Sequence, residues 1–222
     1  MPVRRNYNQN CPIARGLDVL GERWTLLILR ELLGGPRRYG DLRAKLPGIA
    51  SNLLADRLRE LEERGLVDRG ELPPPAARTV YTLSETGWRK VPPVLRAIAV
   101  FGLDLLDPAE STTTPLNAFL AGILLGLDPA RATDLAASYR IEIEGRSFEF
   151  AVDEAGLAPT QGPPTVTVTA SAADLITARL SPAPAERKSA LKRVRFEGHH
   201  DDVDAMRCAF QLTAHPGLTQ RR

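Results

Sequence analysis

Residues 39–70 read YGDLRAKLPGIASNLLADRLRELEERGLVDRG, and their pattern predicts the fold of the first half of the chain. A short helical segment with one apolar face ends at a Pro47-Gly48 turn. A second helix is expected from about residue 50 to residue 64, because leucines recur at helical spacing and a glycine stop follows. Its buried stripe consists of Leu54, Leu58 and Leu61. Two helices joined by a tight turn predict a helix-turn-helix.

The flanking segments predict a winged version of this motif. Residues 22–33 are apolar on nearly every side, which is typical of a centrally buried helix. Residues 66–69 and 78–83 read as strands joined by a proline-rich tip. Ser84 then caps a helix that continues, with a kink at Pro92-Pro93, to about residue 106. The first half is therefore expected to be mostly helical, with a two-stranded wing.

The helix at residues 50–64 is expected to enter the major groove of duplex DNA, because the leucine stripe anchors one face and leaves the opposite face for the partner. Ser51 and Asn52 stand at its N-terminus, where side chains reach base edges. The residues expected to contact DNA come from this helix, the helix before it and the wing: Arg37, Arg38, Tyr39, Ser51, Asn52, Arg57, Arg59 and Arg78. The alternative interpretation is a solvated charged helix face. The order of two helices and a ribbon favours DNA.

Residues 11–106 resemble the HxlR-type transcriptional regulators. The resemblance lies in the Cys-Pro opening and in six motifs: Gly21-Glu-Arg-Trp-Thr25, Tyr39-Gly-Asp-Leu42, Leu46-Pro-Gly-Ile49, Leu54-Ala-Asp-Arg-Leu-Arg-Glu-Leu61, Gly65-Leu-Val67 and Tyr81-Thr-Leu-Ser84. It implies a homodimer on a palindromic operator. Two positions depart from the family. Ala50 replaces the usual serine, so Ser51 is expected to cap the recognition helix, and the wing tip at residues 72–77 is less polar than usual.

The spacing of apolar residues in the helix after the wing also predicts a dimer. Val91, Leu95, Ile98, Gly102 and Leu105 step by 4, 3, 4 and 3 residues, as in a coiled coil. We therefore take Val91, Leu95, Ile98 and Leu105 as candidate dimerisation residues. The alternative is that this stripe packs on the chain's own core.

The composition bounds the class of protein. The chain of 222 residues is long enough for two domains. Residues 1–108 carry 17 Lys+Arg against 13 Asp+Glu, a net +4, whereas residues 109–222 carry 12 against 14, a net −2. A more basic first half fits a polyanionic partner. No apolar run is long enough to span a membrane and the N-terminus lacks a signal core, so a cytoplasmic protein is expected. The resemblance to HxlR-type regulators implies a bacterial, nucleoid-associated protein.

The domain boundary is expected at a polar seam flanked by prolines, Asp107-Pro-Ala-Glu-Ser-Thr-Thr-Thr-Pro115. We expect a DNA-binding and dimerisation domain, a linker, a second domain and a tail, at residues 1–107, 108–114, 115–214 and 215–222.

The second half is expected to be an α+β domain. Two helical segments, near residues 116–125 and 129–137, precede a predicted antiparallel hairpin that turns at Gly145. A further strand follows, Ser171 caps the next helix, and a last strand and helix end the domain.

This half resembles, more loosely, the sterol-carrier-protein fold. The resemblance lies in Thr165-Val-Thr-Val-Thr-Ala170, Ser171-Ala-Ala-Asp-Leu175 and Arg195-Phe-Glu-Gly198. It implies a helix-covered sheet that can enclose a hydrophobic small-molecule effector. The candidate pocket residues are Phe119, Ile123, Phe148 and Phe150. The alternative is that these side chains fill a core whose role is to support the dimer.

Cys11 is the candidate redox residue. It is expected in the first turn of a helix capped by Asn10, with Arg15 one turn further, and both a helix N-terminus and a cation lower a thiol pKa. Some HxlR-type regulators use a cysteine at this place as a redox or quinone sensor. The alternative is an inert, partly buried thiol. Cys208, in contrast, is expected in the core of the last helix.

No metal, cofactor or enzymatic activity is expected. His199-His200-Asp201-Asp202 is interpreted as a capped turn, because adjacent residues rarely converge on one ion. The sequence contains no nucleophile elbow, P-loop, zinc-protease motif or dinucleotide fingerprint.

The leading hypothesis is a homodimeric, DNA-binding repressor whose second domain accepts an apolar effector. One alternative is a lipid carrier in which the first half only dimerises. Another is a regulator that senses oxidants through Cys11.

Overall fold

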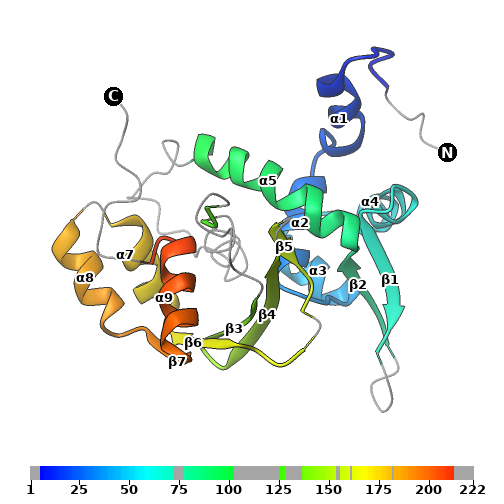
Figure 1. Ribbon diagram of the computed structural model, residues 1–222. Helices are drawn as coiled ribbons and strands as arrows, with labels where there is room; N and C mark the ends of the chain where they lie inside the picture. Colours follow the sequence, from blue (N-terminus) through cyan, green and yellow to red (C-terminus); the bar gives the residue numbers. More distant parts are fainter. Residues whose placement is uncertain are drawn as a thin grey trace. The chain divides into compact units, whose positions relative to one another are not determined.

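The computed structural model describes residues 6–72, 78–102, 126–128, 137–153, 156–160, 162–181 and 183–212. The chain divides into two compact units (Figure 1). The first comprises Met1–Leu32 and Pro36–Gly87, and the second comprises Leu33–Gly35 and Trp88–Arg222. The first unit is mostly helical, and the second combines helices with a sheet. The predicted seam at residues 107–115 lies outside the described residues.

The first unit is a winged helix-turn-helix, as predicted from residues 39–83. Its elements are α1 (Pro12–Leu20), α2 (Thr25–Leu33), α3 (Tyr39–Lys45), α4 (Ser51–Glu63), β1 (Val67–Glu71) and β2 (Thr79–Leu83). The two strands pair antiparallel, with Val67 opposite Leu83. Arg37 adds an isolated bridge to Tyr81, with N···O distances of 2.9 and 2.8 Å.

The leucine stripe of α4 holds this helix on the first unit. Leu54, Leu58 and Leu61 are each at most 2% exposed, so the predicted stripe is confirmed. Burial of one leucine side chain stabilises the fold by about 1.5–3 kcal/mol. Three buried leucines on one face of α4 therefore determine which face points inward. The opposite face is thereby turned to solvent.

The boundaries of three helices in the first unit differ from the sequence predictions. Cys11, not Asn10, is the N-cap of α1. The N-cap of α4 is Ala50 with no side-chain hydrogen bond, so the prediction that Ser51 caps this helix is wrong. Helix α2 begins at Thr25, because Trp24 has a φ of 79° and cannot belong to a right-handed helix. Leu27 is exposed, so α2 is not buried on every side.

Helix α5 (Glu85–Gly102) begins in the first unit and continues in the second. The predicted cap is confirmed, because Ser84 Oγ accepts a hydrogen bond from the Gly87 N–H at 2.9 Å and donates one to the Gly65 carbonyl at 2.6 Å. The helix runs without interruption through Pro92 and Pro93.

The sheet of the second unit has five strands in the order β5-β4-β3-β6-β7. The elements are β3 (Ala137–Ile143), β4 (Arg146–Asp153), β5 (Gly156–Ala158), β6 (Val166–Ala170), α7 (Ala172–Leu180), α8 (Pro184–Leu191), β7 (Arg195–Gly198) and α9 (His200–Ala209). β3 and β6 are parallel and the other neighbours are antiparallel. The predicted hairpin at Gly145 and the cap at Ser171 are confirmed, the latter by a 3.0 Å bond from the Asp174 N–H.

Two contacts within the second unit tie α5 to its surroundings. Arg89 forms a bidentate ion pair with Asp153 at the end of β4, with both N···O distances at 2.6 Å. Arg96 donates a hydrogen bond to the Leu127 carbonyl at 2.7 Å. The predicted helices near residues 116–125 and 129–137 lie outside the described residues, except for Ala137, which begins β3 and is not helical.

Candidate nucleic-acid interface

The solvent-facing side of α4 carries the polar residues that the sequence assigned to DNA contact. Ser51, Asn52 and Arg59 are exposed, together with the small side chain of Ala55. The first N–H groups of a helix have no partner within the helix, and they form a positive end that suits phosphate. This face therefore combines side chains that can form hydrogen bonds with a helix terminus that attracts anions.

Tyr39 connects the first helix of the motif to the start of α4. Its hydroxyl donates a hydrogen bond to the Ser51 carbonyl at 2.5 Å. The sequence assigned Tyr39 to DNA contact, and it gave no signal for this bond because the two residues lie 12 positions apart. The structure thus brings Tyr39, Ser51 and Asn52 together at one end of α4.

The two arginines of α4 have different surroundings. The Arg57 side chain is 13% exposed and pairs with Glu22 at 2.8 Å and with Glu60 at 2.5 Å. The Arg59 side chain is 62% exposed and pairs with Asp56 at 2.8 Å. Exposed pairs within one helix are weak and easily exchanged for another anion. Arg59 is therefore placed to meet a phosphate or a guanine, whereas Arg57 is engaged in the first unit.

The remaining basic candidates lie outside α4, before α3 and before β2. Arg37 is half-buried and its Nε–H lies 3.4 Å from the Glu31 carbonyl oxygen. Arg38 is half-buried and directly precedes α3, where its N–H donates to Asp41. Arg78 is exposed at the start of β2, and its carbonyl accepts a bond from Leu72. The wing tip at residues 73–77 lies outside the described residues.

The N-cap position of α1 changes the chemistry of Cys11. The backbone N–H groups of Ala14 and Ile13, in the first turn of α1, favour the thiolate and lower the pKa of Cys11. Arg15, one turn further, was expected to contribute to this effect, but its guanidinium lies near Asp18, at 3.9 Å. The helix terminus is thus the cause of the lowered pKa.

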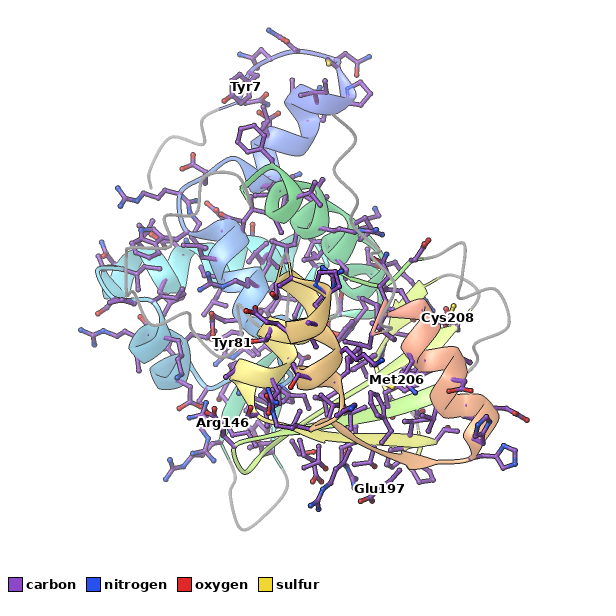
Figure 2. The ribbon with its side chains drawn as sticks, turned by 90° about the vertical axis from the view of Figure 1, so that its left-hand side faces the viewer. Tyr7, Tyr81, Arg146, Glu197, Met206 and Cys208 are labelled. Carbon is purple, nitrogen blue, oxygen red and sulfur yellow. The ribbon has the colours of Figure 1, made fainter. Side chains whose placement is uncertain are left out.

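Cys208 corrects a sequence prediction. It is exposed, because α9 buries the side that carries Met206 and Ala209 (Figure 2). The prediction that Cys208 lies in the core is wrong.

The candidate dimerisation residues of α5 divide into two groups. Val91 and Leu95 are buried within a single chain. Ile98 is 45% exposed, and the neighbouring Phe101 is 76% exposed. Leu105 lies outside the described residues. The exposed apolar surface of α5 is therefore confined to its last turns.

Two of the four candidate pocket residues, both on β4, lie in a packed interior of the second unit. Phe148 and Phe150 are buried. The ring of Phe150 lies 5.4 Å from that of Tyr139 and 5.6 Å from that of Phe210, which follows α9. Phe119 and Ile123 lie outside the described residues. The sequence did not single out Tyr139 for its hydroxyl, which is buried and lacks a hydrogen-bond partner among the described residues.

The described part of the chain contains neither a metal-binding cluster nor a membrane-spanning helix. No group of three or more His, Cys, Asp or Glu residues there could hold a metal ion. His199 is the N-cap of α9, and its ring lies 3.7 Å from Asp201. No described helix is long and apolar enough to cross a membrane.

A winged helix-turn-helix with an exposed polar recognition face defines a class, the helix-turn-helix transcriptional regulators. The sequence profile described as HxlR-like helix-turn-helix matches residues 19–110. The HTH-type transcriptional regulator YvaP of Bacillus subtilis is 33% identical over 105 residues, which cover 47% of this chain and 96% of YvaP. The HTH-type regulator sll1512 of Synechocystis sp. is 41% identical over 97 residues, 44% of this chain and 71% of the relative. The HTH-type transcriptional regulator YodB of B. subtilis is 38% identical over 81 residues, 36% of this chain and 72% of YodB.

The chain therefore belongs to the HxlR-like helix-turn-helix family. This is a family of transcriptional regulators and not of enzymes. The family profile ends at residue 110, so most of the second unit lies beyond the matched residues.

Proposed function

We propose that this protein is a homodimeric, sequence-specific DNA-binding regulator that acts as a repressor in the bacterial cytoplasm. The observation that carries the proposal is the outward face of α4, where Ser51, Asn52 and Arg59 are exposed opposite a buried leucine stripe. In this proposal α4 lies in the major groove, Arg38 and Arg78 contact phosphates, and the dimer excludes other proteins from the operator by occupying it.

Exposed apolar side chains on two helices support the homodimer. Ile13 is 73% exposed on α1 and Leu17 is exposed one turn further, while Ile98 and Phe101 are exposed on α5. Large apolar groups at helical spacing are common at subunit interfaces. A dimer would present two copies of α4 to the two halves of a palindromic operator.

The architecture of the second unit supports a sterol-carrier-like role for this half. A mixed sheet, a serine-capped helix, an edge strand and a final helix follow one another as that fold requires. We propose that an apolar effector enters between the sheet and its helices and displaces part of the aromatic packing. A ligand that prefers one arrangement of the dimer would change the spacing of the two recognition helices.

The lowered pKa of the Cys11 thiol supports a second candidate, regulation by oxidants or electrophiles. A thiolate is the reactive form of cysteine, and α1 also carries the exposed Ile13 and Leu17. Modification at the start of α1 would therefore act on the proposed dimer surface.

The proposal is tested by selecting duplexes from a random library with the full-length protein, followed by binding measurements on the selected sequence. We expect affinity for that duplex to exceed affinity for a scrambled duplex by at least about a thousandfold, and to fall steeply with salt. Arg59→Ala is expected to cost about 1–3 kcal/mol on the selected duplex, and the exposed Arg193→Ala in the second unit should have no effect. Equal affinity for the two duplexes would contradict the proposal.

A further inference from the structure

The recognition helix α4 is held at two points by a turn that carries none of the proposed DNA-reading residues. We call residues Gly21 to Trp24 the α1–α2 turn, because they join those two helices. The Glu22 carboxylate accepts a hydrogen bond from Arg57 Nη2 at 2.8 Å, in the middle of α4. The Trp24 ring lies beside Gly48, three residues before α4 begins.

The α1–α2 turn has a fixed shape. The Gly21 N–H bonds to the Leu17 carbonyl at 2.8 Å, and a Cβ on Gly21 would lie 2.7 Å from the same oxygen. The Thr25 and Ile28 N–H groups bond to the Glu22 and Trp24 carbonyls. Trp24 has a φ of 79°, a strained conformation for a non-glycine residue that is kept only where the surroundings impose it.

Both contacts are close enough to set the orientation of α4. A Cβ built on Gly48 would lie 3.8 Å from Trp24 Cη2, so the indole lies against the turn that precedes the recognition helix. Arg57 bridges Glu22 and Glu60 and is 13% exposed. Its guanidinium forms ion pairs with two carboxylates of the protein. This arrangement is typical of an arginine that stabilises the structure and not of one that contacts a base.

We infer that the α1–α2 turn positions α4 for DNA reading, with Glu22 and Trp24 as positioning residues and Arg57 as their contact on the helix. The inference rests on the proposed function, and it removes Arg57 from the residues that contact DNA. Hydrogen bonds to base edges are lost over a fraction of an ångström, whereas charge attraction to phosphate changes slowly with distance. A misplaced α4 should therefore lose sequence-specific binding and keep non-specific binding.

The direction in which a substitution at Glu22 changes DNA affinity shows whether Glu22 positions α4 or only contributes charge. Glu22→Gln removes a negative charge, which by charge alone strengthens binding to every duplex. The inference predicts the opposite on the selected duplex, a loss of about tenfold, with the scrambled duplex unchanged or bound slightly more tightly. Glu62→Gln is the matched control, because it removes one charge from an exposed residue of α4 and should not lower the preference for the selected duplex.

A double-mutant cycle decides whether Arg57 positions or reads. We expect Arg57→Gln to weaken binding of the selected duplex about tenfold in the wild type and less than about twofold in the Glu22→Gln background. Arg57→Lys keeps the charge but cannot bridge both carboxylates, and it should lose specificity as well. The melting temperature of each variant is measured, and all affinities are compared at a temperature below the lowest of these values.

The outcomes distinguish this inference from the proposed function. A wild-type protein without sequence preference overturns both. A wild type that prefers its selected duplex, with Glu22→Gln retaining that preference, overturns the inference alone. Equal losses from Arg57→Gln in both backgrounds would make Arg57 a direct DNA contact and also overturn it.

Discussion

The two units of this chain arrange their polar and apolar groups in opposite ways. In the first unit, α4 buries its leucines and turns Ser51, Asn52 and Arg59 to solvent. In the second unit, the sheet turns Tyr139 and Phe150 inward, and even a hydroxyl is buried without a partner among the described residues. The first unit can therefore meet a partner without rearranging its core. An effector of the second unit must open a packed interior.

Phe150→Ala tests the packed interior and should have the largest effect. The ring is 1% exposed and contacts two other rings, so its removal is expected to lower the free energy of unfolding by about 3–5 kcal/mol. Denaturant unfolding of the full chain measures this loss. Glu149→Ala, at the neighbouring exposed position of β4, serves as the control and should change stability by less than about 1 kcal/mol. If Phe150→Ala lowers the free energy of unfolding by less than about 1 kcal/mol, the interior of the second unit is not tightly packed. The two units would then not differ in the way described above.

Gly48→Ala tests the fixed geometry on which the open face of α4 depends. Gly48 has a φ of 91°, so alanine is expected to cost about 1–2 kcal/mol of stability. Gly40→Ala is a close control, since Gly40 lies in α3 with open space around it, and alanine should stabilise that helix by about 0.5–1 kcal/mol. A lower melting temperature for Gly48→Ala together with a higher one for Gly40→Ala would support a turn held by its backbone. Melting temperatures that change in the same direction in both variants would contradict it.

Tyr139→Phe sharpens the comparison from the interior side. Burial raises the pKa of the Tyr139 hydroxyl, and the charge of Asp202 adds to this effect, so the group stays neutral. Removing a buried hydroxyl that has no partner should leave stability unchanged or raise it by about 1 kcal/mol. Tyr7→Phe, at an exposed position, should have no effect. A marked loss of stability with Tyr139→Phe would show that the hydroxyl has a partner in the native protein.

The smallest effect is expected in the alkylation rates of the two cysteines. One cysteine lies in each unit, so their rates allow a direct comparison of the units. The pKa of Cys11 is lowered, so its thiolate is present at a lower pH than that of an ordinary thiol, and alkylation near neutral pH should be faster than at the exposed Cys208. Rates in Cys11→Ser and Cys208→Ser variants assign each reaction to its residue. The advantage that the lowered pKa gives Cys11 should shrink as the pH rises, because an ordinary cysteine thiol is then also ionised. Equal rates at neutral pH would remove the basis for sensing through Cys11.

Features that depend on neighbours along the chain could be predicted from the sequence. The leucine stripe of α4, the hairpin at Gly145 and the caps at Ser84 and Ser171 follow from spacing within a few residues, and all are present in the structure. Periodicity identifies which face of an element is apolar, because each helix or strand repeats its side-chain directions regularly.

Contacts between side chains that are far apart in the sequence could not be predicted and are seen only in the folded chain. Arg57 and Arg59 look equivalent in sequence, and they differ because Glu22, 35 positions earlier, is brought to one and not to the other. Trp24 leaves α2 because of its backbone conformation, and Cys208 is exposed because α9 packs through its other side. The physical reason is that ion pairs and burial depend on packing between elements, which local spacing does not encode.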